Sequence, residues 1–290
     1  MSARTVLVCG VGLMGHGIAQ VMAQAGHVVR AYEPERSRAE AGVDRIRGNL
    51  ERSVAKGRLG AGESAGILER ITICGSVEEG ADGIDLAVEA VFEDEDVKRD
   101  LFARLDAAAP EAAILATNTS SISITRIAGA ARPERRPRVV GMHFFSPVPV
   151  MPLIELIRGD ETSDATEAQI RGIADELGKK VIVSRDRPGF IVNRILMPFL
   201  AESMRAYEEG LGTAEDIDTG ARIGLNHPMG PLELADFIGL DVCLSIMKVL
   251  HEGLDQPHFA PPRVLTDLVE AGHLGQKTGR GFHSYPRDAS

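Results

Sequence analysis

The feature that most constrains this sequence is a glycine-rich turn near its start, Gly10-Val11-Gly12-Leu13-Met14-Gly15. The turn stands between an apolar run, Thr5–Cys9, and a helical pattern over 14–25. In such a strand–turn–helix unit the first glycine permits a tight turn, the second lets a pyrophosphate approach the backbone, and the third lets the helix pack against the strand. Free N–H groups at the helix start then attract phosphates. The turn therefore predicts a dinucleotide-binding domain.

A carboxylate follows at the end of the next predicted strand, over 28–32. Glu33 lies 18 residues after Gly15. A carboxylate at that place accepts hydrogen bonds from ribose hydroxyls and would repel a 2′-phosphate. The sequence therefore predicts NAD rather than NADP as the cofactor, although a structural glycine turn with a surface glutamate is the alternative. The residues predicted to bind it are Gly10, Gly12, Leu13, Met14, Gly15 and Glu33.

Two kinds of pattern divide the chain. Over 1–187, short apolar runs alternate with helical patterns, which predicts an α/β fold with a doubly wound, Rossmann-like parallel sheet. The dipeptide Pro188-Gly189 is a natural break. Over 188–290 we expect an all-helical domain, with helices at 190–209, 214–223, 232–250 and 262–271. The predicted strands are 5–9, 28–32, 71–74, 85–89, 113–117, 138–143, 153–157 and 180–184.

Composition argues against several classes of function. The net charge of −10 leaves no overall basic field to draw the chain to nucleic acid or an anionic membrane. Its uncharged stretches are interrupted by glycines, polar side chains or prolines, which argues against a membrane span. The three cysteines are widely spaced and form no CxxC pair, so we expect a cytoplasmic protein without disulfides or a metal site.

Polar side chains also follow two predicted strands, at the edge where an α/β sheet carries its chemistry. These are Ser120, in Asn118-Thr119-Ser120-Ser121, and His143. A lone histidine among apolar residues is more often a core residue than a base. Glu155, 12 residues further on, changes that balance. A carboxylate can orient the imidazole through one ring nitrogen and leave the other to take a proton from a substrate hydroxyl.

Taken together, seven motifs spread over residues 4–285 resemble the 3-hydroxyacyl-CoA dehydrogenases, most closely their short monofunctional form. The resemblance implies NAD-dependent oxidation of an (S)-3-hydroxyacyl-CoA, such as 3-hydroxybutyryl-CoA, and the reverse reduction of acetoacetyl-CoA. It also implies a homodimer. The motifs are the glycine turn, Glu89-Ala90-Val91-Phe92-Glu93, Asn118-Thr119-Ser120-Ser121, His143-Phe144-Phe145-Ser146-Pro147, Pro188-Gly189-Phe190-Ile191-Val192-Asn193-Arg194, His227-Pro228-Met229-Gly230-Pro231 and Lys277-Thr278-Gly279-Arg280-Gly281-Phe282.

The resemblance also implies a role for individual residues. His143 would be the general base and Glu155 its orienting partner. Ser120 and Asn193 would bond the reacting oxygen, with Asn193 supplied by the helical domain across an interdomain cleft. The residues that would contact NAD are Glu33, Glu93, Lys98, Ser120, Ser146 and Lys277.

Some of these assignments have simpler alternatives. Glu93 and Lys98 could be solvated charges at a helix start, and Lys277 a charge in the tail. The family usually has Asn in place of Ser146, which leaves that contact with the nicotinamide side open. It commonly has Asp in place of Glu33, but the longer side chain should still bond the ribose.

A CoA thioester is strongly anionic, whereas this chain is net negative, so a local basic site is required. On the helix predicted over 43–56, Arg45, Arg52 and Lys56 lie on one stripe, opposite the apolar face. We expect Arg52, Ser53 or Lys56 to contact the CoA nucleotide. An ordinary solvated helix face is the alternative.

Three other functions compete with this one. A dehydrogenase of free β-hydroxyacids is disfavoured, because Gly189 stands four residues before Asn193, where that family has a catalytic lysine. A related enzyme with a non-CoA substrate fits Phe144-Phe145 less well. The third is a protein that binds NAD without turnover. Apolar runs in the helical domain, at 195–197 and 242–249, exceed the needs of its own core and also predict a homodimer.

Overall fold

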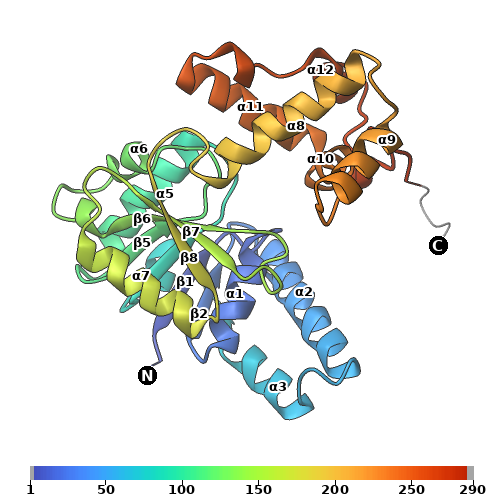
Figure 1. Ribbon diagram of the computed structural model, residues 1–290. Helices are drawn as coiled ribbons and strands as arrows, with labels where there is room; N and C mark the ends of the chain where they lie inside the picture. The colour runs from blue at the N-terminus through green and yellow to red at the C-terminus, as the bar shows by residue number, and fades with distance from the viewer. Residues whose placement is uncertain (1–2, 286–290) are drawn as a thin grey trace. The chain divides into compact units, whose positions relative to one another are not determined.

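A computed structural model describes residues 3–285, and the chain divides into two compact units between Arg187 and Pro188 (Figure 1). Among the residues described, no helix is long and apolar enough to cross a membrane. The first unit is built on one sheet of eight strands in the order β3-β2-β1-β4-β5-β6-β7-β8. The strands are β1 (Thr5–Cys9), β2 (Val28–Tyr32), β3 (Ile71–Ile73), β4 (Leu86–Glu89), β5 (Ile114–Thr117), β6 (Val139–Phe144), β7 (Leu153–Arg158) and β8 (Lys180–Arg185).

The last two strands are arranged differently from the parallel pairs before them. The pairs from β3 through β6 are all parallel, but β7 runs antiparallel to β6, and β8 is parallel to β7. Parallel neighbours need a long crossover connection, whereas residues 145–152 form only a short link between β6 and β7. The chain therefore turns back on itself there, and the parallel sheet predicted from the strands over 5–143 is confirmed for β1 to β6.

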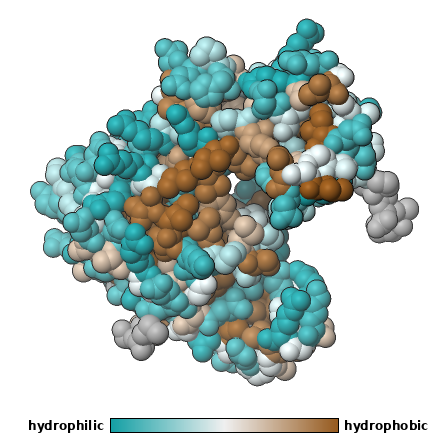
Figure 2. Space-filling model, viewed as in Figure 1, coloured by the Kyte–Doolittle hydropathy of each residue, from teal (hydrophilic) through white to brown (hydrophobic). Residues whose placement is uncertain are grey.

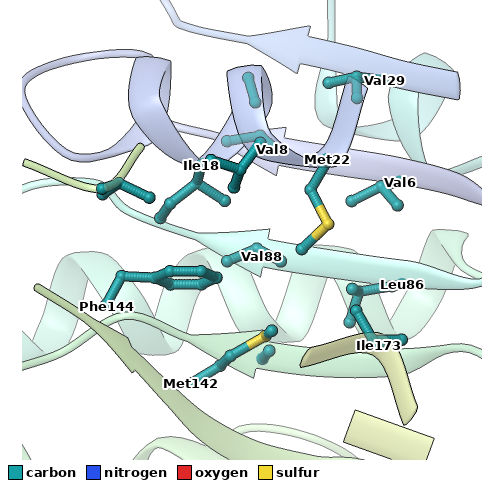
Figure 3. Close-up of a cluster of buried hydrophobic side chains, with 14 of the residues drawn as sticks. Val6, Val8, Ile18, Met22, Val29, Leu86, Val88, Met142, Phe144 and Ile173 are labelled. Carbon is teal, nitrogen blue, oxygen red and sulfur yellow. The ribbon is translucent and has the colours of Figure 1, made fainter. Parts of the chain in front are cut away.

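Helices cover both faces of the sheet, as a doubly wound fold requires (Figure 1). Between α1 and the sheet, Ile18 and Met22 point toward Val8, Val88 and Phe144 in the largest apolar cluster (Figure 3). The short helices α3, α4 and α6 were not predicted from the sequence. The helices of this unit are α1 (Gly15–Gln24), α2 (Arg36–Ala55), α3 (Ala61–Glu69), α4 (Val77–Ala81), α5 (Glu95–Ala108), α6 (Ile124–Ala128) and α7 (Asp164–Glu176), with a 3-10 turn at Arg136–Arg138.

The second unit is helical throughout its regular structure. The single helix predicted over 232–250 was wrong, because Gly239, with φ +104°, separates α10 from α11. Its helices are α8 (Val192–Glu208), α9 (Ala214–Thr219), α10 (Pro231–Ile238), α11 (Leu240–Leu254) and α12 (Arg263–Glu270), with a π turn at Gly220–Gly224 and 3-10 turns at Pro257–Phe259 and Gln276–Thr278.

One buried carboxylate fastens the end of the chain to α10. Asp236 is 1% exposed and accepts hydrogen bonds from the backbone N–H groups of Phe282 and His283 and from the hydroxyl of Tyr285. Burial raises the pKa of Asp236, and these donors oppose that rise. A Cβ atom on Gly281 would lie 1.8 Å from a carboxylate oxygen of Asp236, so only glycine fits there. The hydrogen bonds of this segment therefore have a structural role within the second unit.

Candidate active site

The three glycines of the turn differ in the space around them. A Cβ atom on Gly10, which has φ +89°, would lie 2.4 Å from the carbonyl oxygen of Ala90. A Cβ atom on Gly15 would lie 1.6 Å from the carbonyl oxygen of Gly10. Gly12 has no such neighbour, because its Cβ atom would meet nothing within 4 Å. The fold thus requires the first and third glycines, whereas the space above Gly12 is left for a group from outside the chain.

Glu33 closes this turn from the end of β2. Its carboxylate accepts a hydrogen bond of 2.5 Å from the backbone N–H of Val11. The α1 helix begins directly after the turn, and Met14 at its N-cap supplies no side-chain bond to the first N–H groups. The His16 N–H donates to the Gly12 carbonyl at 3.3 Å, whereas the N–H groups of Gly15 and Gly17 face no side-chain cap and can meet a phosphate. Leu13 beside them is 75% exposed. The residues predicted to bind NAD on this side therefore fit a dinucleotide.

His143 and Glu155 face each other across the antiparallel edge of the sheet. They are direct partners in the register of β6 and β7, and His143 Nδ1 lies 3.1 Å from Glu155 Oε2. Because a carboxylate accepts and does not donate, Nδ1 carries the proton of this bond. Glu155 is fully buried and His143 is 5% exposed, so the carboxylate fixes the ring in a protected setting.

Ser120 approaches the other ring nitrogen. Its Oγ lies 3.2 Å from His143 Nε2, and the side chain is half-buried. Asn118, two residues earlier, accepts a 2.8 Å hydrogen bond from the backbone N–H of Phe144. The end of β5 is thus tied to the end of β6 beside the histidine. The structure brings Ser120, His143 and Glu155 into one chain of polar contacts.

A network of buried charged side chains supports the turn that carries Ser120, residues 118–121. Lys98 is 1% exposed, so it is not the solvated helix-start charge considered from the sequence. Its ammonium lies 2.6 Å from Glu89 and 3.2 Å from Glu93. Glu89, which the sequence analysis assigned no role of its own, also accepts hydrogen bonds from Thr117 and Val91. The single ammonium of Lys98 is thus shared between two carboxylates at this end of β4.

Glu93 in turn holds the polar turn after β5. Its carboxylate accepts hydrogen bonds from the Thr119 hydroxyl (2.5 Å), the Ser120 N–H (2.9 Å) and the Ser121 hydroxyl (3.1 Å). Burial opposes ionisation of Glu93, but Lys98 and these hydrogen bonds outweigh it and lower the pKa. For Glu89 the balance is reversed: burial dominates and raises the pKa. The ionised Glu93 therefore positions the segment that presents Ser120.

A cavity of about 360 Å³ lies within the first unit, between α1, α2 and the 146–150 segment. One wall is basic and the other apolar, a combination that suits an anionic ligand with an apolar arm. Of the residues predicted to bind CoA or NAD, this cavity brings together Leu13, Arg52, Ser53, Lys56 and Ser146. Arg58 and Val150, which were not predicted, also line it.

Lys179 anchors the apolar wall of this cavity. Its side chain is 6% exposed, and its ammonium donates 2.7 Å hydrogen bonds to the carbonyl oxygens of Val148 and Met151. Burial lowers the pKa of Lys179. Nothing in the sequence pointed to this lysine, because its partners are backbone atoms about 30 residues earlier in the chain.

The two remaining predicted residues lie in the second unit. Asn193 is 7% exposed in the first turn of α8. Lys277 lies in the 3-10 turn Gln276–Thr278 and forms an ion pair with Asp241 of α11. Across residues 3–285, no group of three or more His, Cys, Asp or Glu side chains could hold a metal ion.

Sequence models of known families match nearly the whole chain. The 3-hydroxyacyl-CoA dehydrogenase NAD binding domain matches residues 5–187, and the C-terminal domain of the same family matches residues 189–285. A 3-hydroxybutyryl-CoA dehydrogenase from Bradyrhizobium diazoefficiens is 48% identical over 97% of this chain and 95% of its own. Both halves of the chain therefore match the same family.

Two solved structures are similar over the same length. The (S)-3-hydroxybutyryl-CoA dehydrogenase PaaH1 from Ralstonia eutropha has a TM-score of 0.94 and 42% identity, covering 99% of this chain and all of its own. FadB2 from Mycobacterium tuberculosis has a TM-score of 0.95 and 43% identity, with the same coverage. The fold described above is thus the fold of these proteins.

Substitution of Gly12 tests whether the open space above it receives the cofactor. Gly12→Ala adds a methyl group that meets no protein atom within 4 Å. We expect the melting temperature to stay within about 2 °C of the wild type. The affinity for NADH should fall by about tenfold or more, because the methyl group occupies the space that a pyrophosphate needs. NADH fluorescence titration and thermal unfolding measure the two effects separately.

Gly15→Ala is the matched control, since its methyl group would collide with the Gly10 carbonyl. This variant should lose about 3 kcal/mol or more of stability through overpacking. Wild-type affinity for NADH in Gly12→Ala would show that the turn does not hold the pyrophosphate.

Proposed function

The chain belongs to the 3-hydroxyacyl-CoA dehydrogenase family, and on that premise we propose that it oxidises short (S)-3-hydroxyacyl-CoA thioesters, chiefly 3-hydroxybutyryl-CoA. In reverse it reduces acetoacetyl-CoA. The observation that carries this proposal is the His143–Glu155 pair with Ser120 at 3.2 Å, in the unit whose glycine turn fits a dinucleotide. Glu33 supports NAD over NADP, because a carboxylate there would repel a 2′-phosphate.

Proton transfer is the task of His143. Its Nε2 accepts the proton of the substrate 3-hydroxyl as the C3–H bond breaks and the C–O bond becomes a carbonyl. When bound, NAD supplies the acceptor for the hydride that leaves C3. In the reverse direction the imidazolium returns the proton to the oxygen. Because Nδ1–H is held by Glu155, the nitrogen that faces the substrate is the basic one in the neutral ring.

Glu155, Ser120 and Asn193 have supporting roles. The buried Glu155 carboxylate stabilises the imidazolium that forms on His143, since opposite charges interact strongly in a protected site. The Ser120 hydroxyl donates to the substrate oxygen and holds it near Nε2. We assign the same task to the Asn193 amide, on the ground of the family motif in which it stands.

Two glutamine variants separate the role of the base from that of its orienting partner. His143→Gln should lower kcat for acetoacetyl-CoA reduction by about 10²–10⁴-fold, the usual contribution of general acid–base catalysis. Glu155→Gln should lower it by about 10–100-fold, because the ring keeps a partner but the imidazolium loses its counter-charge. Loss of NADH absorbance measures turnover, and NADH titration checks that cofactor binding is intact. Turnover by His143→Gln within threefold of wild type would exclude His143 as the base.

The basic wall of the 360 Å³ cavity is the proposed site for the CoA nucleotide. Arg52→Glu with Lys56→Glu should raise KM for acetoacetyl-CoA by about 10–100-fold, since two charge-assisted phosphate contacts become repulsive. Affinity for NADH should change little. The control is Arg47→Glu with Arg171→Glu, which changes net charge equally but lies outside the cavity. Equal KM values for the two double variants would place CoA elsewhere.

We also propose a homodimer formed through the second unit. Four of its aliphatic side chains are more than 60% exposed: Ile195, Leu211, Ile223 and Leu225. Figure 2 shows brown, apolar areas on the surface of this unit. Exposed apolar surface of this kind marks a protein interface.

The cysteines Cys9, Cys74 and Cys243 are free, which supports a reducing cytoplasmic location.

Light scattering after gel filtration tests the dimer. We expect a mass about twice the 31.1 kDa of the chain at micromolar concentration. Ile223→Lys with Leu225→Lys should shift the mass toward one chain, because lysine ammonium groups resist burial in an apolar interface. A wild-type monomer at that concentration would contradict the proposal.

A further inference from the structure

His16 has no part in the function proposed so far, yet it stands between two hollows of the first unit. It is the second residue of α1 and lines both the 360 Å³ cavity and a more open hollow of about 570 Å³. Asn49 and Arg52 of α2 also line both. Any anion held by Arg52 in either hollow therefore lies in the neighbourhood of the His16 ring.

A backbone contact determines which nitrogen of His16 faces a ligand. Nδ1 lies 2.7 Å from the carbonyl oxygen of Gly12. A carbonyl only accepts, so Nδ1 must carry a proton in both the neutral and the charged ring. In the neutral ring Nε2 is then a bare lone pair, which repels phosphate oxygens. Only protonation turns Nε2 into a donor, and it adds a positive charge at the same time.

The charges around His16 favour an anion. In the open hollow α2 presents Arg45, Arg52 and Asp44, and the Asp44 carboxylate already pairs with Arg47. In the cavity the charged groups are Arg52, Lys56 and Arg58. Residues 146–150, which form the apolar wall of the cavity, carry no charged side chain. Basic side chains thus outnumber acidic ones in both hollows that His16 lines.

Polar contacts between α1 and α2 keep these groups in place. Asn49 donates a 2.9 Å hydrogen bond to the side-chain oxygen of Gln20 on α1, and Arg52 donates to the side-chain oxygen of Asn49. Gly17, next to His16, packs against Val148, because a Cβ atom there would lie 2.9 Å from it. The position of the imidazole relative to Arg52 is therefore set by the fold.

We propose that His16 is a proton-dependent phosphate ligand, which binds a phosphate group of the CoA thioester beside Arg52 when its ring is charged. The identity of that ligand rests on the proposed function; the tautomer and the basic surroundings do not. Histidine changes charge between about pH 5 and 8. The contribution of His16 to acyl-CoA affinity is then present at the acidic end of this range and is lost as pH rises.

The test compares wild type, His16→Asn and His16→Arg by calorimetric titration with acetoacetyl-CoA at about pH 6 and about pH 8. Asparagine keeps a donor for the Gly12 carbonyl but cannot be charged, whereas arginine is charged at both values. Wild type should bind about three- to tenfold more tightly than His16→Asn at the lower pH and equally at the higher one. The ratio of His16→Arg affinity to His16→Asn affinity should be alike at both pH values, and such ratios cancel the titration of the ligand itself.

NADH titration under the same conditions shows whether the phosphate that His16 binds belongs to CoA or to the dinucleotide. We expect wild type and His16→Asn to bind NADH with equal affinity. A pH-dependent ratio with NADH instead of acetoacetyl-CoA would assign His16 to the dinucleotide and overturn the proposal. If the ratio of wild-type to His16→Asn affinity for acetoacetyl-CoA is the same at both pH values, the proposal fails as well, with the proposed function intact. Failure of the wild type to bind acetoacetyl-CoA at either pH would remove the proposed function itself and the CoA contact with it.

Discussion

The antiparallel pairing of β6 with β7 is the constraint on which the rest of the site depends. It sets His143 directly opposite Glu155 and buries the carboxylate completely. A buried charge without a partner is strongly destabilising, so the pair holds the ring and the strand register together. Asn118 then joins β5 to β6 next to the histidine, and Ser120 reaches Nε2 from the same strand end. The proton transfer proposed for His143 therefore relies on groups that the sheet holds in place.

Two other buried charged residues, Lys98 and Lys179, also hold neighbouring segments of the first unit in position. Lys98 joins Glu89 to Glu93, and Glu93 carries the turn that presents Ser120. Lys179 holds the backbone of the 146–150 wall through two carbonyl oxygens. In each case a buried charged group is held by several hydrogen bonds or ion pairs. Rigid support of this kind keeps the groups of the proposed site in place.

The glycine turn, the alternation of strands with helices and the spacing of His143 and Glu155 could be recognised in the sequence because each rests on neighbouring residues. The direction of β7 cannot be read from its own residues, because a buried apolar strand reads the same whether it runs parallel or antiparallel. Only the short link before it indicates the reversal. Helical periodicity likewise continues through Gly239, where both flanking helices bury apolar faces. The burial of Lys98 and Lys179 depends on partners supplied by other elements, which no local pattern encodes.

Asp236 makes the stability of the helical unit depend on residues 282–285. A product that ends before Gly281 lacks the N–H groups of Phe282 and His283 and the hydroxyl of Tyr285. It then carries a buried carboxylate without its donors in the middle of the helical unit. Loss of these donors costs the unit about 1–3 kcal/mol of stability or more. The helical unit thus depends on residues that lie 46 to 49 positions after the carboxylate they satisfy.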